Sequence, residues 1–249
     1  MSTEETRSYR DPVGERTQAA VSARKKREER FPNALTVYDS FYITFTSTDK
    51  RSAAFLAGSE GIIGTELTLL FSNKDAEEEA VFLLARDEAV IARVSEADAA
   101  RLRFHYEKDW AIKAVLSLIF YHEAKKCFSA ELACFCYDRM LDDSYGHALE
   151  NFVNNLIYRI NKGAHPTLEL GQEQFIKVLE SKGAWYLTKN MPYPPKEKGV
   201  IIYKRRRIWS EYLVVAAMNG NLGCRIAAIA FWVLVAAAVV FALWWFLIR

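Results

Sequence analysis

Cysteine is scarce in this sequence, which has 4 cysteines among 249 residues. Cys127, Cys134, Cys136 and Cys224 have neither the density nor the regular spacing of a secreted disulfide framework, so we expect free thiols and no disulfides. Cys134 and Cys136 are two residues apart on a predicted helix and would point away from each other, which favours buried thiols over a zinc site. Cys224 lies beside a long apolar run, where reversible acylation is the alternative to an unmodified thiol.

Charge of one sign is not in excess either, with 33 Lys and Arg against 31 Asp and Glu. A formal net charge of +2 gives no strongly basic surface, and we predict no nucleic-acid partner. The first thirty residues lack the apolar core of a signal peptide, and the chain contains no N-x-Ser/Thr sequon. These absences favour a chain that is kept out of the secretory lumen.

Complete catalytic motifs are also missing. The sequence has no G-x-S-x-G elbow, and His122-Glu123 fails as a zinc motif because Lys126 stands where H-E-x-x-H needs its second imidazole. Asp142-Asp143 fits the charged start of a helix, with a phosphoryl-transfer metal site as the alternative. The histidines are scattered over separate predicted elements. We therefore predict no catalytic residue, no metal site and no cofactor.

Glycine is infrequent, with 11 residues, yet three glycines are evenly spaced at Gly58, Gly61 and Gly64. Such glycines could let backbone amides approach a phosphate. Neither G-x-G-x-x-G nor G-x-x-x-x-G-K-[ST] is present, however, and no lysine closes the loop. A flexible turn between strands is the better interpretation.

What the sequence does contain is one long apolar run, residues 226–248, without charge, amide or proline. At about 1.5 Å of helical rise per residue, this run is long enough to cross the roughly 30 Å hydrocarbon core of a bilayer. We therefore predict a single C-terminal transmembrane helix, with Trp244 and Trp245 at the headgroup boundary. Ala238 and Ala242 permit a weak homo-oligomer through this helix, with lipid-facing packing as the alternative.

Basic residues are concentrated before this run, which predicts that the N-terminal domain faces the cytoplasm and that the C-terminus lies across the membrane. The residues expected to contact the membrane surface are Lys204, Arg205, Arg206, Arg207, Trp209, Arg225, Trp244 and Trp245.

Strand signals dominate the first half of the chain. Phe41, Ile43 and Phe45 alternate with polar or amphipathic residues within 34–48, and a second strand is predicted at 66–71. Residues 77–94 fit either a helix or two short strands, AVFLLA and AVIARV; we prefer the hairpin because it places every charge in a turn or at an edge.

Helix signals dominate the second half. A helix is predicted from the N-cap Ser95 to about Lys126, since residues 110–121 are apolar nearly all round and look like a buried central helix. A second helix is predicted at 130–141 with Ser129 as its cap. A third, amphipathic helix follows Ser144 and ends at Gly163, and a shorter one ends at Gly183.

The predicted fold class is α+β: a small antiparallel sheet followed by a helical bundle, with a single C-terminal transmembrane helix. The expected segments are a mobile charged arm (1–31), an α+β cytoplasmic domain (32–189), a proline-rich spacer (190–199), a basic amphipathic juxtamembrane segment (200–225) and the transmembrane helix (226–248). For residues 200–225, the alternative to an amphipathic juxtamembrane segment is a last strand or helix that packs on the domain.

These features favour a tail-anchored single-pass membrane protein that acts as a protein-interaction or scaffolding module. Its partners would be the lipid bilayer and a second protein. One alternative is a membrane-bound hydrolase or transferase with a site assembled from distant residues; another is a lipid-binding domain with an elongated cavity. A cluster of His122 with acids or thiols in a pocket would favour the enzyme, whereas an exposed apolar patch without such a pocket would favour the interaction module.

Overall fold

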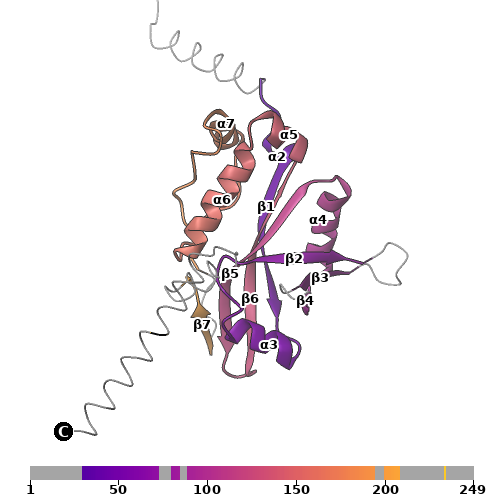
Figure 1. The fold of residues 1–249 in the computed structure, drawn as a ribbon, viewed down its shortest axis with the longest axis vertical. Coiled ribbons are helices and arrows are strands. Elements are labelled where there is room, and N and C mark those ends of the chain that lie inside the picture. The colour runs from indigo at the N-terminus through magenta and orange to yellow at the C-terminus, as the bar shows by residue number, and fades with distance from the viewer. Residues whose placement is uncertain (1–29, 73–79, 85–88, 194–198, 208–232, 234–249) are drawn as a thin grey trace, which may run out of the picture.

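The computed structural model describes residues 30–72, 80–84, 89–193, 199–207 and 233. These residues form a curled antiparallel sheet that carries helices on both faces, in the shape of a half-barrel (Figure 1). The strand order is β1-β6-β5-β2-β3-β4, with β7 also paired to β5. The strands are β1 (Tyr38–Thr46), β2 (Glu66–Phe71), β3 (Val81–Leu84), β4 (Val90–Arg93), β5 (Ala111–His122), β6 (Cys127–Tyr137) and β7 (Val200–Lys204).

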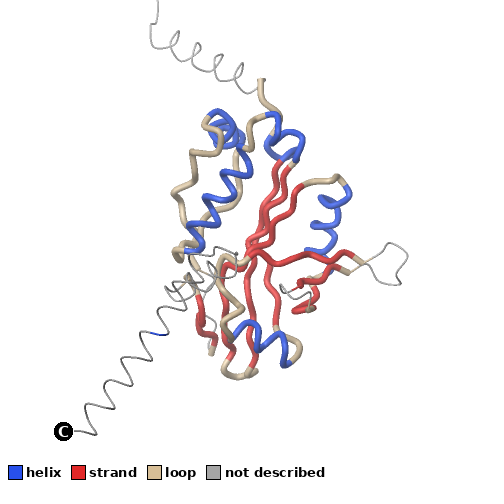
Figure 2. Tube along the Cα trace, viewed as in Figure 1, coloured by secondary structure: helices blue, strands red, loops and turns tan. Residues whose placement is uncertain are grey.

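The helices flank this sheet. They are α2 (Ala34–Val37), α3 (Lys50–Ala57), α4 (Glu96–Glu107), α5 (Arg139–Ser144), α6 (Ala148–Asn161) and α7 (Gln172–Glu180). The predicted order of a small sheet followed by a helical bundle is therefore wrong. The largest error lies at 111–137, where the structure has the two longest described strands instead of two helices (Figure 2).

Burial on both faces explains why β5 and β6 resemble helices in sequence. Every residue of β6 from Ser129 to Tyr137 is buried, and so is β5 from Ala114 to Ile119. A strand covered on one face alternates between apolar and polar residues, but a strand covered on both faces has no such period. The 12-residue length of β5 also favours a helix, because most strands are shorter.

The curl of the sheet comes from the way β5 shares one edge between two partners. The first half of β5 pairs with β2, where Glu66 lies opposite Val115, and its last residues pair with β7, where His122 lies opposite Val200. A register shift between Leu116 and Leu118 separates the two halves, and such irregularities increase twist. β2 thus leaves the long strands at a steep angle (Figure 2), and the far strand β4 comes back into contact with β1.

The two faces of β1 contact different helices. The ring of Tyr38 packs edge-on against Phe152 of α6, with centroids 6.1 Å apart. The next residue, Asp39, binds Arg101 and His105 of α4 on the opposite face. The predicted alternation in this strand is confirmed, and it places α6 and α4 on opposite sides of the long strands.

Several local predictions are also confirmed. β2 occupies 66–71 as expected, and β3 and β4 form the preferred antiparallel hairpin rather than a helix. Ser95 caps α4 by accepting a hydrogen bond from the Asp98 amide. The amphipathic helix is α6, although it begins after His147 rather than directly after Ser144. At 200–204 the alternative of a last strand is the one observed.

The predicted single-pass topology is corrected as well. Within the described part of the chain, no helix combines the length and the apolar composition that a bilayer crossing requires. Of the run 226–248, only Val233 belongs to the described residues. The tail-anchored localisation, with its cytoplasmic N-terminal domain, is therefore not supported by the structure.

Candidate functional site

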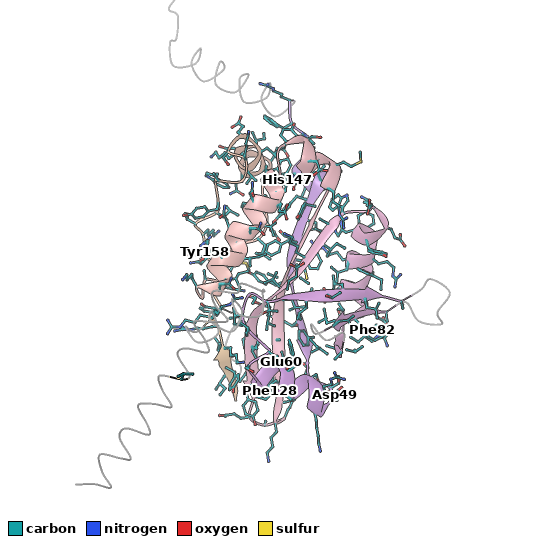
Figure 3. The ribbon with its side chains drawn as sticks, in the orientation of Figure 1. Asp49, Glu60, Phe82, Phe128, His147 and Tyr158 are labelled. Atoms are coloured by element: carbon teal, nitrogen blue, oxygen red, sulfur yellow. The ribbon has the colours of Figure 1, made fainter. Side chains whose placement is uncertain are left out.

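An open groove runs between α3 and β4 and has a volume of about 220 Å³. Its helical wall consists of α3 and the turn after it, and its other wall is the start of β4. Residues from both walls line the groove, among them Arg51, Phe55, Gly58, Glu60, Val90 and Ile91. Glu60 lies beside α3 at the lower end of the molecule (Figure 3).

The α3 wall of the groove is fixed by local hydrogen bonds. Asp49 and Ser52 form a capping box at the start of α3, which satisfies backbone amides that would otherwise lack partners. At the other end, the amides of Gly58 and Gly61 donate to the carbonyls of Ala54 and Phe55. A Cβ atom on Gly61 would lie 2.6 Å from the Phe55 carbonyl oxygen, so glycine is needed where the turn folds back on the helix.

Apolar side chains are exposed on and near the β4 wall. Val90 is 48% exposed at the start of β4, and Leu70 of β2 is equally exposed. Leu70 pairs with Phe82 of β3, so these two side chains share one face of the sheet. Figure 3 shows Phe82 toward the side of the molecule that carries β2 and β3.

Among the described residues, the most deeply buried ion pair lies on the α6 side of the sheet, and neither of its members lines this groove. Nε2 of His165 is 3.0 Å from Oε1 of Glu131, a residue in the middle of β6. Each side chain is only 4% exposed. The imidazole of His165 packs between the rings of Tyr42, 4.5 Å away, and Tyr193, 5.6 Å away. On its other nitrogen, Nδ1 lies 3.2 Å from the Pro192 carbonyl oxygen.

This geometry fixes how protons are distributed over the pair. The Nδ1 of His165 must donate to the Pro192 carbonyl, so one further proton is shared between Nε2 and Glu131. Burial would lower the pKa of His165, but the hydrogen bond and charge of Glu131 outweigh it and raise the pKa above its ordinary value. Because Pro192 and Tyr193 both contact His165, this pair holds the segment before β7 on the sheet.

A second cluster joins β1 to α4. The Asp39 carboxylate accepts hydrogen bonds from Arg101 Nε and from His105 Nε2, each at 2.8 Å. Burial alone would raise the pKa of Asp39, but these two hydrogen bonds and the nearby charges hold it well below its usual range. The Arg101 guanidinium also lies 3.8 Å from the Phe41 ring centre, and His105 stacks on Trp110. These polar contacts hold α4 against β1.

A third group, Asp142, His147 and Glu150, has ligand atoms close enough together for a metal ion. Oδ1 of Asp142 already accepts a 2.6 Å hydrogen bond from the Leu149 amide, and Glu150 forms an ion pair with Lys113. His147 takes a left-handed conformation, φ 57°, directly before α6 (Figure 3). Capping of the α6 N-terminus therefore accounts for this group.

Of the residues that could have signalled an enzyme, His122 lies directly opposite Cys127 in the register of β5 and β6, whereas Cys134 and Cys136 lie further along β6. Nε2 of His122 is hydrogen-bonded to the Ser129 hydroxyl at 2.7 Å. Cys134 and Cys136 are buried free thiols on β6, and burial raises the pKa of both. Neither His122 nor these cysteines line the groove between α3 and β4.

Of the predicted membrane-surface residues, the structure describes Lys204 to Arg207. Lys204 Nζ donates to the carbonyl oxygens of Gly58 and Gly61, and Arg207 Nε donates to that of Ile63 at 3.1 Å. Arg205 and Arg206 are exposed. The remaining predicted contacts, Trp209, Arg225, Trp244 and Trp245, lie outside the described residues. Membrane contact by any of these side chains stays a prediction.

The pair of Glu131 and His165 was not predicted from the sequence. One signal was available: Glu131 is a single acid inside the apolar stretch SAELACFC, and a buried carboxylate requires a partner. Nothing in the sequence names that partner, because His165 is 34 residues away.

Comparisons with known proteins add no family. No protein-family model matches the sequence, and no curated protein matches it. A crystal structure of a protein from Lactobacillus plantarum is similar to part of the chain, with 9% identity and a TM-score of 0.28, over 40% of this chain and 99% of that one. A likeness this weak carries no argument about fold or function.

Proposed function

We propose that this domain is a protein-interaction module that binds an extended segment of a partner protein in the groove between α3 and β4. The observation that carries the proposal is the construction of the groove, which has a helix on one side and the last strand in the sheet order on the other. Grooves of this kind take an extended peptide along the strand while its side chains contact the helix.

The size of the groove supports a peptide over a small substrate. Small-molecule pockets usually have volumes of about 300–1,000 Å³ and enclose most of their ligand. At about 220 Å³ and open to solvent, this groove suits two or three side chains of a longer segment. The exposed Val90 offers an apolar contact at its edge.

The chemistry of the lining also favours binding over catalysis. Arg51 and Glu60 are the charged residues among those that line the groove. Acid–base catalysis needs titratable groups within hydrogen-bond reach of the substrate, whereas Glu131 and His165 lie on the α6 side of the sheet, in contact with Tyr42 and Tyr193.

Selection of peptides from a phage-displayed random library on the purified full-length protein tests this proposal. We expect selected peptides to bind the wild type and to lose at least tenfold in affinity against Val90→Asp. Leu35→Asp is the matched control, since Leu35 is also highly exposed but lies on α2, outside the groove. Hydrogen exchange should show peptide-dependent protection at 90–93.

Two results would overturn the proposal. One is a selection that yields no peptide above background. The other is a set of peptides that bind wild type and Val90→Asp equally well while the protection falls on another element. Circular dichroism of both variants verifies that they are folded.

A further inference from the structure

Apolar side chains of three strands meet on one face at the end of the β5–β6 hairpin. Tyr121 of β5 lies opposite Phe128 of β6 on one side and opposite Ile201 of β7 on the other. Directly opposed residues point to the same face of a sheet, as do residues two apart in one strand. A register shift in β7 lies at Tyr203, but its ring centre is 5.1 Å from that of Phe128, so Tyr203 joins this face. We call Tyr121, Phe128, Ile201 and Tyr203 the hairpin-tip surface.

This surface is unusually apolar for an exposed position. Ile201 is 46% exposed and Tyr203 is 47% exposed, while Tyr121 and Phe128 are half-buried. Phe128 lies at the lower end of the molecule, beside the turn that connects β5 to β6 (Figure 3). Contiguous exposed apolar groups on a folded domain mark interaction sites.

Positive charge borders the hairpin-tip surface. Lys125 and Lys126 are exposed in the β5–β6 turn. The exposed Arg205 and Arg206 follow the other end of β7 and lie beside Gly163 after α6, so they do not belong to this border. Glu123 is the acidic side chain of the same turn. The border thus carries more positive than negative charge, which complements an anionic partner.

We propose that the hairpin-tip surface docks peripherally on an anionic lipid bilayer. Tyr121, Phe128, Ile201 and Tyr203 would enter the headgroup boundary, where aromatic rings with one polar end are favoured. Lys125 and Lys126 would face acidic headgroups. The proposal uses residues outside the groove between α3 and β4 and does not depend on the function of that groove.

Ring packing favours a bilayer over a nucleic acid. Phe128 is tilted against Tyr121 at 4.9 Å and lies edge-on to Tyr203 at 5.1 Å, with an interplanar angle of 68° for the second pair. The rings therefore cover one another, whereas stacking of single-stranded bases needs open ring faces. An aliphatic side chain, Ile201, completes the surface and suits lipid better than a base.

The other basic residues of this region hold β7 in place. Lys204 donates to the carbonyl oxygens of Gly58 and Gly61, and Arg207 donates to that of Ile63. Tyr203 also donates to the Ala57 carbonyl oxygen at 3.4 Å. The end of α3 thereby positions Ile201 and Tyr203, and the headgroup contacts are left to the exposed lysines of the β5–β6 turn.

An environment-sensitive fluorescent amino acid at the exposed Ala124 tests the proposal in the full-length protein. We expect its emission to shift to the blue with phosphatidylcholine vesicles that contain 30% phosphatidylserine, and to stay unchanged with phosphatidylcholine alone. The same probe at Met140, an exposed residue at the opposite end of the domain, should not respond. This local readout is independent of any other membrane contact of the chain.

Charge reversal supplies the matched variants. The double variant Lys125→Glu with Lys126→Glu should need an at least 25-fold higher lipid concentration for the half-maximal emission shift, since each lysine contributes about fivefold to the affinity. Lys182→Glu with Lys189→Glu changes the net charge equally but lies away from the tip and should have no effect. A missing shift, an equal shift with neutral vesicles, or a shift with an RNA oligonucleotide but not with vesicles would overturn the proposal.

Discussion

Glu131 and His165 form a hydrogen-bonded pair, 3.0 Å from Oε1 to Nε2, with 4% of each side chain exposed. The pair connects the centre of β6 to the segment that leads toward β7, because His165 also contacts Pro192 and Tyr193. A buried charged group is tolerated only when its partner is in place. The pair is therefore a point where one substitution should affect the whole domain.

Replacement of His165 by alanine should lower the free energy of unfolding by about 3–5 kcal/mol, since it leaves Glu131 buried without its partner. Urea denaturation followed by circular dichroism measures this loss. Lys177→Ala is the control, because it removes an exposed ion pair with Glu173 and should cost about 0–1 kcal/mol. Equal losses in the two variants would show that Glu131 does not depend on His165.

The same pair should make stability depend on pH. The pKa of His165 is raised in the folded protein above its ordinary value of 6.5. The stabilisation is then fully present below about pH 6.5 and is lost as the pH rises through the folded-state pKa. The difference in unfolding free energy between wild type and His165→Gln should therefore decrease as the pH is raised from about 6 through the folded-state pKa of His165. A difference that stays constant with pH would contradict the raised pKa of His165.

A side chain at Gly64 should destabilise the domain. Its φ is +80°, and a Cβ atom there would lie 1.4 Å from Oδ1 of Asn161 at the end of α6. Gly64→Ala should cost about 2–4 kcal/mol, from the left-handed conformation together with the clash. Gly146→Ala is a matched control: its φ is +65° with nothing within 4 Å of the added atom, so only the conformational cost of about 1 kcal/mol applies.

Lys204 should contribute to stability through the turn after α3. It donates to the carbonyl oxygens of Gly58 and Gly61, so Lys204→Met should lower the unfolding free energy by about 1–2 kcal/mol. Arg205→Met, at the exposed neighbouring position, should change it by less than about 0.5 kcal/mol. If both variants unfold at the same urea concentration, Lys204 does not fix β7 to this turn.

The sequence by itself determined the elements whose surroundings differ between two faces or two ends. The alternation of Phe41, Ile43 and Phe45 predicted β1, and apolar spacings of three and four predicted α6. Ser95 marked the start of α4. In each case the signal is local, because a half-buried helix or strand has apolar and polar residues that alternate with the period of that element.

Only the tertiary structure decided what depends on contacts from far along the chain. β5 and β6 are strands because they pair with each other and with β1, β2 and β7. Their burial on both faces leaves no period in the sequence. Likewise, Glu131 contacts His165, which is distant in the sequence, only once the chain has folded. Lys204 contacts the turn after α3 for the same reason. Residue type predicts that a buried charge needs a partner, but the fold alone selects which residue that partner is.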